Sequence, residues 1–194
     1  MRKRAGDEVS HGSRFFRYNL DVLRFIILFF LITGSVNAAV LETKEHALWA
    51  IFSNPTVIEK NFFLNEIQKE QIQKLSKSKL ASPLILYSEV YENDQLVGYV
   101  FFDKHRVRTM PETVVVALNL KGQIKQIRIL TFSEPKDYLV PARWLALFEK
   151  KDLDESLWIK QDIPVVAGST LSSWAVLKSA RTALAFYKVV IKGQ

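Results

Sequence analysis

Cysteine is absent from the 194 residues of this chain. Its absence excludes disulfides, thiolate metal sites, iron–sulfur clusters and a cysteine nucleophile. Glycine and proline are sparse, at 7 and 6 residues, and 48% of the chain is apolar, so disorder and collagen-like structure are also excluded. A chain of this length and composition predicts one globular domain that buries a core without covalent staples.

The basic excess is weak evidence for a nucleic-acid partner. The formal net charge of +7 comes from 27 Lys and Arg against 20 Asp and Glu. Several basic residues precede an early apolar run, namely Arg2, Lys3, Arg4, Arg14, Arg17 and Arg24. The remaining basic residues are scattered among acidic ones, whereas nucleic-acid-binding proteins concentrate them on one face. We therefore expect no nucleic-acid partner.

Residues 1–38 have the layout of a secretory signal peptide. The apolar run Phe25–Ile32 follows the basic region, and Val36-Asn37-Ala38 fits the small-x-small pattern of signal peptidase, which predicts cleavage after Ala38. The alternative is an uncleaved membrane anchor, although the stretch from Phe25 to Leu41 has only 17 residues and a span needs about 20. Both interpretations predict an extracytoplasmic protein, in the periplasm or on the outer face of the membrane.

The segment 39–82 is expected to be an N-terminal helical segment. Residues 45–52 and 62–75 each gather apolar residues on one side at helical spacing, and Pro55 separates them. Neither predicted helix carries a pattern that requires a chemical function. We interpret both as helices that pack on a core.

Residues 83–194 then change to a strand pattern. Four runs rich in β-branched and aromatic residues occur at 84–91, 96–102, 113–120 and 124–131. Short turn sequences join the first two runs at 92–95 and the last two at 121–122. Sequential strands with tight turns predict an antiparallel sheet, so the fold class is α+β, with helices flanking the sheet.

The C-terminal third is predicted to be mostly helical. A loop at 132–138 contains Pro135, and it is followed by a helix at 140–150 and a polar connection at 152–161. A last helix is predicted from about Ser172 to Val190. Its buried stripe is Val176, Ala180, Ala183, Leu184 and Tyr187, and Lys178, Arg181 and Lys188 lie on another side.

Small and hydroxylated residues crowd the start of this last helix, in the segment 166–173. Free backbone N–H groups and the positive end of the helix dipole make such a terminus suitable for phosphate. Gly168 would let the backbone approach a ligand closely. The alternative is ordinary helix capping by Ser172 or Ser173, and the residues alone leave both open.

The segment Ala167-Gly168-Ser169-Thr170-Leu171-Ser172 resembles the Ser-Gly-Ala-Thr-x-Ser motif of the FMN-binding domain family. That family includes the flavin-carrying subunits of Rnf and sodium-pumping quinone reductase complexes and many exported flavoproteins. Other matching positions follow in the family's order, namely Gly98-Tyr99, Gly122, Phe132-Ser133-Glu134-Pro135, Trp144 and Phe148. The resemblance covers about residues 84–190, and it departs from the motif at Ala167 and Ser169.

The resemblance implies a cofactor, a linkage and a maturation partner. In that family a flavin transferase moves FMN from FAD onto the motif threonine, which corresponds to Thr170, and forms a phosphoester. Cofactor-binding residues are then expected at Gly168, Ser169, Thr170, Leu171 and Ser172. By the same analogy, Glu134, Pro135 and Tyr138 would form a wall near the flavin ring; the alternative is a rigid turn with a buried tyrosine.

His105, Arg106 and Arg108 form a second conspicuous group. They are candidates for binding phosphate, ribityl hydroxyls or a reduced, anionic flavin, and a solvated loop with surface ion pairs is the alternative. His105 has no second histidine at metal-ligand spacing, so we expect no zinc or haem site.

The sequence therefore predicts an exported flavoprotein that carries FMN and transfers electrons between membrane or extracytoplasmic redox proteins. A flavin-dependent reductase of a small substrate is one alternative. The other is an interaction module that has lost FMN. Covalent and tightly bound non-covalent FMN both remain open.

Overall fold

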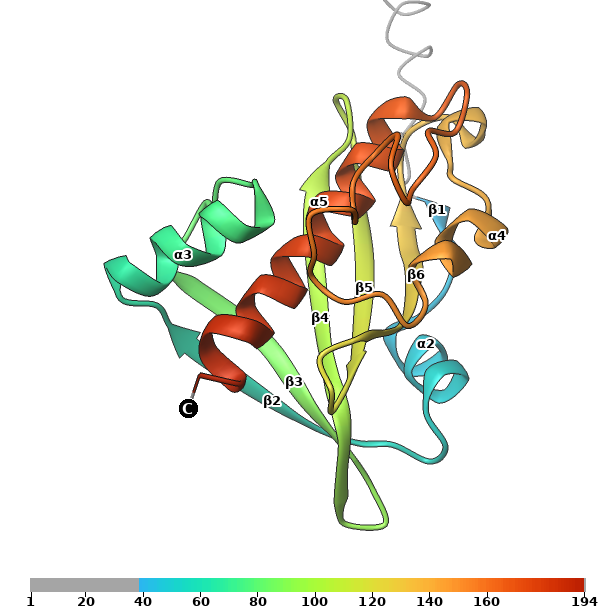
Figure 1. Cartoon of the computed structure of the whole chain (residues 1–194). Coiled ribbons are helices and arrows are strands. Elements are labelled where there is room, and N and C mark those ends of the chain that lie inside the picture. Colours follow the sequence, from blue (N-terminus) through green and yellow to red (C-terminus); the bar gives the residue numbers. More distant parts are fainter. Residues whose placement is uncertain (1–38, 194) are drawn as a thin grey trace, which may run out of the picture. The chain divides into compact units, whose positions relative to one another are not determined.

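The computed structural model describes residues 39–193, which build one antiparallel sheet with helices on both faces (Figure 1). The strand order is β1-β6-β5-β4-β3-β2. The strands are β1 (Ala39–Val40), β2 (Thr56–Phe63), β3 (Leu84–Glu92), β4 (Gln95–Arg106), β5 (Pro111–Asn119) and β6 (Ile124–Phe132). The predicted α+β class and antiparallel sheet are confirmed, and all four predicted strands are present.

The β3–β4 hairpin turns on Asn93 and Asp94, which both have positive φ, 49° and 61°. Two left-handed residues match the right-handed twist of the flanking strands, and Asn and Asp tolerate that conformation best after glycine. The turn predicted at 92–95 is therefore correct in place and length.

The N-terminal segment differs from the prediction. Residues 62 and 63 do not start a helix; they end strand β2, which pairs with β3 from Thr56↔Tyr91 to Phe63↔Leu84. The helix α3 begins later and spans Glu66–Ser76, behind a capping box made by Asn65 and Gln68. The helical spacing of apolar residues predicted a helix from Phe62, but the pairing of Phe62 and Phe63 with β3 overrides it. The segment 39–82 is thus mixed, and its strands belong to the same sheet as the rest.

The two faces of the sheet are covered unequally. The helices α5 (Thr170–Phe186), α3 and α4 (Ala142–Leu145) pack over one face and enclose the larger core, which includes Trp144 and Phe148. On the other face, α2 (Lys44–Ile51) is the one helix of residues 39–193, and it packs over a small cluster with Val115 and Ala117 of β5. The alternating burial along β5 follows from strand geometry, since successive side chains point to opposite faces.

The helix predicted at 140–150 is shorter and tighter than expected. A 3₁₀ turn stands on each side of α4, η1 (Lys136–Tyr138) before it and η2 (Ala146–Phe148) directly after it. The helical segment ends because Lys150 and Lys151 bond to the start of β6. The N–H of Lys150 donates to the carbonyl of Ile124, and the N–H of Ile124 donates to the carbonyl of Lys151. This pairing returns the chain to the sheet.

The last helix has the predicted buried stripe, and one charged residue outside the stripe is also buried. α5 begins at Thr170, two residues earlier than expected, and continues into a π-helical turn, η3 (Tyr187–Ile191). Arg181, which was expected on another side of the helix from this stripe, is itself only 1% exposed. Its guanidinium donates to the carbonyls of Leu75, Ser76, Asp154 and Leu157.

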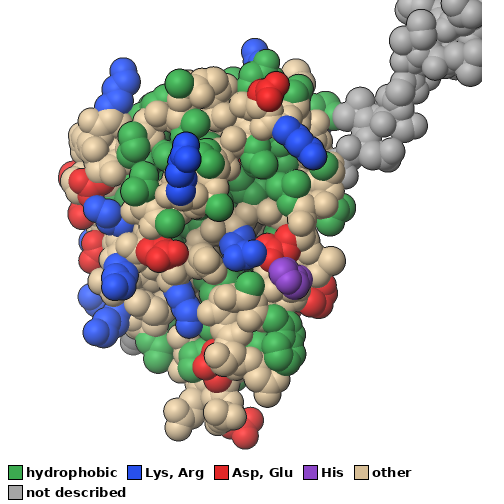
Figure 2. Space-filling view, turned by 90° about the vertical axis from the view of Figure 1, so that its right-hand side faces the viewer, with side chains coloured by type: hydrophobic (Ala, Val, Ile, Leu, Met, Phe, Trp, Pro, Cys, Tyr) green, Lys and Arg blue, Asp and Glu red, His purple; other side chains and the backbone are tan. Residues whose placement is uncertain are grey.

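The predicted leader, residues 1–38, lies outside the described residues. Among residues 39–193, no helix has both the length and the apolar character needed to span a membrane. On the face seen in Figure 2, Lys and Arg side chains are interspersed with Asp and Glu and with exposed apolar side chains.

Candidate functional site

Three segments that are far apart in sequence meet at the N-terminal end of α5. They are the tip of the β4–β5 hairpin at 107–110, the loop 133–139 and the hydroxyl-rich segment 166–173. Figure 1 shows this end of α5 beside the hairpin tip. The loop is tied to both other segments by hydrogen bonds, so the structure brings together most of the residues expected to bind the cofactor.

The serine hydroxyls of the motif are used within the protein. Ser169 Oγ lies 3.2 Å from the carbonyl oxygen of Asp137 and 3.4 Å from that of Leu139, and it donates toward them. Ser172 Oγ donates to the carbonyl of Tyr138 at 2.5 Å, and Ser173 Oγ donates to the carbonyl of Ser169 at 2.9 Å. All three serines are buried. The hydroxyls of Ser169 and Ser172 fix the loop to the helix, that of Ser173 bonds one turn back along the chain, and the N-cap residue makes no side-chain cap.

Thr170 differs from these serines. It is the first residue of α5, it is exposed, and its hydroxyl makes no hydrogen bond to any described residue. The N-cap residue Ser169 provides no side-chain cap, and the N–H groups of Thr170, Leu171 and Ser172 likewise have no partner in residues 39–193. A free hydroxyl therefore stands beside free N–H donors at the positive end of a long helix, which is the environment that a phosphate needs.

Gly168 has φ of +83°, a conformation that side chains disfavour. An added Cβ would meet only the carbonyl oxygen of Asp137, at 3.9 Å. Glycine is therefore needed here for the backbone turn into the helix, and lack of space is not the reason.

Glu134 acts as a clamp on the β4–β5 hairpin. One carboxylate oxygen accepts hydrogen bonds from the backbone N–H groups of Thr109 and Met110, at 2.8 and 2.9 Å, and from that of Arg108 at 3.3 Å. These backbone hydrogen bonds lower the pKa of Glu134. The guanidinium of Arg108 lies 5.0 Å from the ring centre of Tyr138, a cation–π contact. Glu134, Tyr138 and Arg108 thus brace one another, and Pro135 is exposed next to them.

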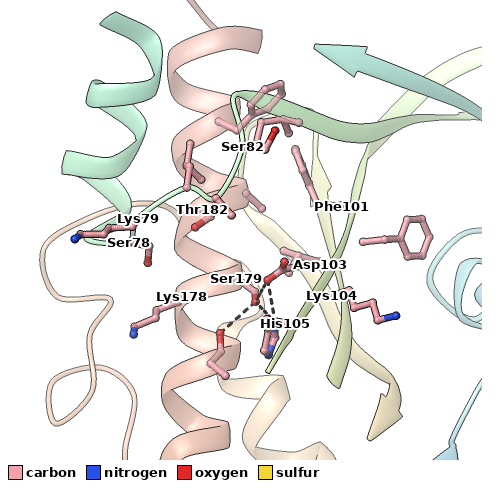
Figure 3. A pocket seen from close by; sticks show the side chains of 18 of the residues that line it. Ser78, Lys79, Ser82, Phe101, Asp103, Lys104, His105, Lys178, Ser179 and Thr182 are labelled. Atoms are coloured by element: carbon pink, nitrogen blue, oxygen red, sulfur yellow. Dashed lines mark hydrogen bonds and ion pairs between the residues drawn. The ribbon is translucent and has the colours of Figure 1, made fainter. Parts of the chain in front are cut away.

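A cleft of about 1030 Å³ begins one residue beyond Thr170. Leu171, Trp174, Lys178 and Thr182 of α5 line one wall, and Phe101–Val107 of β4 line another. Figure 3 shows Phe101 among the lining residues, Lys79 and Lys178 on one side, and Lys104 on the other side of β4. Pockets for small ligands measure about 300–1,000 Å³, so this cleft is large enough for a cofactor.

His105 lines this cleft and contacts two carboxylates. Its Nδ1 is 3.0 Å from Asp103 Oδ2, and its Nε2 is 2.8 Å from Glu112 Oε2 (Figure 3 shows the Asp103 side). Burial acts to lower the pKa of His105, but the hydrogen bonds to Asp103 and Glu112 outweigh it and raise the pKa to about 9. Both ring nitrogens are therefore donors to protein groups, so His105 has none left for a ligand.

Ser179 of α5 completes this cluster by donating to Asp103. Sequence analysis missed Asp103, Glu112 and Ser179, because the strand pairing of His105 with Glu112 lies beyond the predicted ends of both strands. Glu112 is fully buried, and its Oε1 has no hydrogen-bond partner among residues 39–193. No cluster of three or more His, Cys, Asp or Glu able to hold a metal occurs in that range.

Comparison with family models gives one match, to the FMN-binding domain, over residues 110–185. The chain carries an FMN-binding domain. No curated protein and no solved structure matches the chain. The match includes Glu134, Tyr138 and the whole hydroxyl-rich segment, and it leaves out His105, Arg108 and the strands β2 to β4.

FMN is the cofactor of this domain, and the described residues fit it. The first turn of α5 offers the unpartnered N–H groups of Thr170, Leu171 and Ser172 to a phosphate. The adjoining cleft is lined by apolar and aromatic side chains such as Leu171, Trp174 and Phe101, which suit a flat ring system. Bound flavin would supply the redox chemistry, and the protein would supply position and charge.

Proposed function

We propose that this protein is an exported electron carrier whose FMN is bonded to Thr170 through a phosphoester. The observation that carries the attachment is the contrast among the hydroxyls of the motif. Ser169, Ser172 and Ser173 are buried and hydrogen-bonded to carbonyls, whereas Thr170 is exposed and unpartnered within residues 39–193. Of these four oxygens, that of Thr170 alone is free to react.

The attachment step needs a flavin transferase and FAD. The bond between Thr170 Oγ1 and the phosphorus of the FMN phosphate forms as the pyrophosphate bond of FAD breaks. AMP leaves, and the hydroxyl proton is lost. The first turn of α5 favours this chemistry, because its free N–H groups and dipole stabilise the negative phosphate.

The motif's departure at Ser169 does not weaken the proposal. A second hydroxyl beside Thr170 would compete for the flavin if it were accessible. Ser169 is 3% exposed, and its oxygen points to the carbonyls of Asp137 and Leu139. It therefore acts as a brace between helix and loop.

A covalent tether suits a protein outside the cytoplasm, because a dissociated cofactor would be lost there. We propose that the protein is located in the periplasm or on the outer face of the membrane. Its proposed partners are membrane or extracytoplasmic redox proteins. N-terminal sequencing of protein from an extracytoplasmic fraction should begin at Ala39, the first residue of β1. Intact protein recovered in the cytoplasm would contradict export.

The attachment is tested by co-expression with a flavin transferase, followed by a denaturing gel viewed under ultraviolet light. Thr170→Val keeps the shape and removes the hydroxyl, so the fluorescent band should disappear. Thr56→Val changes another exposed threonine, at the start of β2, and should keep the full band. Peptide mass spectrometry should place one FMN on Thr170. A band that persists in Thr170→Val, or a label on Ser169, would contradict the assignment.

A further inference from the structure

The sheet is split between β3 and β4. The two strands pair only from Glu92↔Gln95 to Ser88↔Val100. Beyond that point, residues 84–87 pair with β2 alone and residues 101–106 pair with β5 alone. Figure 1 shows the two strands diverging from their hairpin. The cleft lies in this opening, since Leu84, Ile85 and Leu86 line it on one side and Phe101–Val107 on the other.

The free edge of β4 presents backbone donors and acceptors to the opening. Val107 N–H donates to the carbonyl of Met110, which marks 107 and 110 as a hydrogen-bonded pair. In an antiparallel ladder such pairs alternate with pairs whose backbone groups point outward. Phe102, Lys104 and Arg106 therefore direct their N–H and C=O groups away from β5 and into the opening. None of these groups has a partner within residues 39–193.

Unpaired strand edges in a half-enclosed cleft require a partner. A flat molecule with donors and acceptors along one edge meets that need. The pyrimidine side of an isoalloxazine ring has this character, with a carbonyl, an N–H and a second carbonyl in a row. The cleft also begins at Leu171, directly beside Thr170, and α5 residues line it as far as Phe186, about 22 Å of helix.

We propose that the isoalloxazine ring of the FMN enters the opening between β3 and β4 and hydrogen-bonds the free backbone edge of β4 at Lys104 and Arg106. This inference rests on the phosphate lying at Thr170. It places the ring between β3 and β4 and away from the loop with Glu134 and Tyr138, whose contacts already brace the hairpin. That loop then shapes the phosphate end of the site.

The charges around the opening suit a reduced flavin. Lys104, Arg106 and Lys178 line the cleft and form no ion pair in the described part of the chain. The acids nearby, Asp103 and Glu112, are both engaged by His105. The unpaired charge that lines the opening is therefore positive, which would stabilise negative charge on the pyrimidine side of the ring.

Amide hydrogen exchange tests the proposal on flavinylated full-length protein. The amides of Lys104 and Arg106 should exchange about tenfold more slowly, or slower still, in labelled protein than in unlabelled Thr170→Val. The amides of Asp103 and His105 face β5 and should not change, so they serve as an internal control. Equal exchange at these two edge amides in both proteins, with the label confirmed by mass, would overturn the proposal.

A blocking variant sharpens the test. Ala175→Phe places a ring in the cleft, whereas Ala146→Phe adds the same ring to an exposed site on η2. Ala175→Phe should retain the label, lose edge protection and shift the flavin absorption band; Ala146→Phe should behave as wild type. Tyr138→Ala should leave the band unchanged, and a shift in Tyr138→Ala alone would place the ring on the loop and refute the proposal.

The outcome also separates this proposal from covalent attachment. If wild-type protein takes no label, the attachment at Thr170 fails. The same exchange comparison is then made on unlabelled protein with and without added FMN. Protection at Lys104 and Arg106 would support the ring position, and no protection at saturating FMN would overturn it.

Discussion

The two halves of α5 use their polar side chains in opposite ways. At the N-terminal end, serine hydroxyls bond to loop carbonyls and leave Thr170 and the first-turn N–H groups free. Eleven residues later, Arg181 is buried and directs its guanidinium at four carbonyls of α3 and the 154–157 connection. One helix thus carries an accessible reactive group at one end and a fully engaged charge further along.

The difference shows that the availability of a polar group decides its role. From the sequence alone, an arginine and a threonine both look suitable for binding a phosphate. Arg181 has its donors on protein carbonyls, including Leu75 and Ser76 at the C-terminal end of α3, where a positive charge is favoured. Thr170 has no such partner among residues 39–193. The predictions below remove these contacts in turn, from the largest expected effect to the smallest.

Arg181→Met should cause the largest loss of stability. Methionine keeps an apolar stem but leaves the carbonyls of Leu75, Ser76, Asp154 and Leu157 without their donor. We expect a decrease of roughly 3 kcal/mol in the free energy of unfolding, because hydrogen bonds to a charged group contribute about 1.5–3 kcal/mol and are not additive. Urea denaturation measures this change.

Lys188→Met is the matched control, since Lys188 is exposed and was expected on the same side of the helix as Arg181. Its unfolding free energy should stay within about 0.5 kcal/mol of wild type. Folded Arg181→Met should still take the FMN label, because Thr170 lies three turns away. Equal stability of the two variants would refute the role of Arg181 as a brace.

Sequence patterns captured the parts of the fold that depend on local periodicity. The four predicted strands, the turn at 92–95 and the buried stripe of α5 were correct because alternation and helical spacing encode which face is buried. Strand β2 was missed because an edge strand with no fully buried residue has a weak pattern, and its pairing with β3 is a long-range property. The burial of Arg181 was missed for the same kind of reason, because its carbonyl partners lie far away in the sequence.

The sequence predicted which residues form the candidate site better than it predicted the contacts between them. The family resemblance singled out the segment 167–172 and Glu134, and the structure brings both to one end of α5. The opening between β3 and β4 could not be predicted, because no local signal tells where a strand ladder ends. The pairing of His105 with Glu112 depends on the hairpin register, which residue types alone do not specify.

The histidine cluster provides the second prediction, a pH dependence of stability. Asp103 and Glu112 raise the pKa of His105 to about 9 against burial, from an ordinary value of 6.5. Because the folded-state pKa is the higher one, the stabilisation is fully present below pH 6.5 and is lost as the pH rises through about 9. The full contribution is at most ~3 kcal/mol.

The measurement compares wild type with His105→Gln, which cannot carry the charge. The difference in unfolding free energy between them should shrink when the pH is raised from about 6 to about 10. Ser179→Ala, which removes a neutral donor to Asp103, should shift stability without changing this pH profile. A difference that grows with pH would mean that His105 is neutral in the folded protein.

The smallest effect is expected from Ser169→Ala, and it separates bracing from attachment at the open end of α5. The variant removes hydrogen bonds to the carbonyls of Asp137 and Leu139, which are 3.2 and 3.4 Å long. Bonds this long are weak, so unfolding should become easier by about 1 kcal/mol or less. The FMN label should be retained, because the hydroxyl of Thr170 and the first-turn N–H groups are unchanged.

Ser172→Ala removes the shorter bond to Tyr138 and should cost more than Ser169→Ala in the same denaturation series. If Ser169→Ala instead abolished the label while the protein stayed folded, the reactive oxygen would be that of Ser169. The contrast drawn between the buried serines and the free threonine would then be wrong.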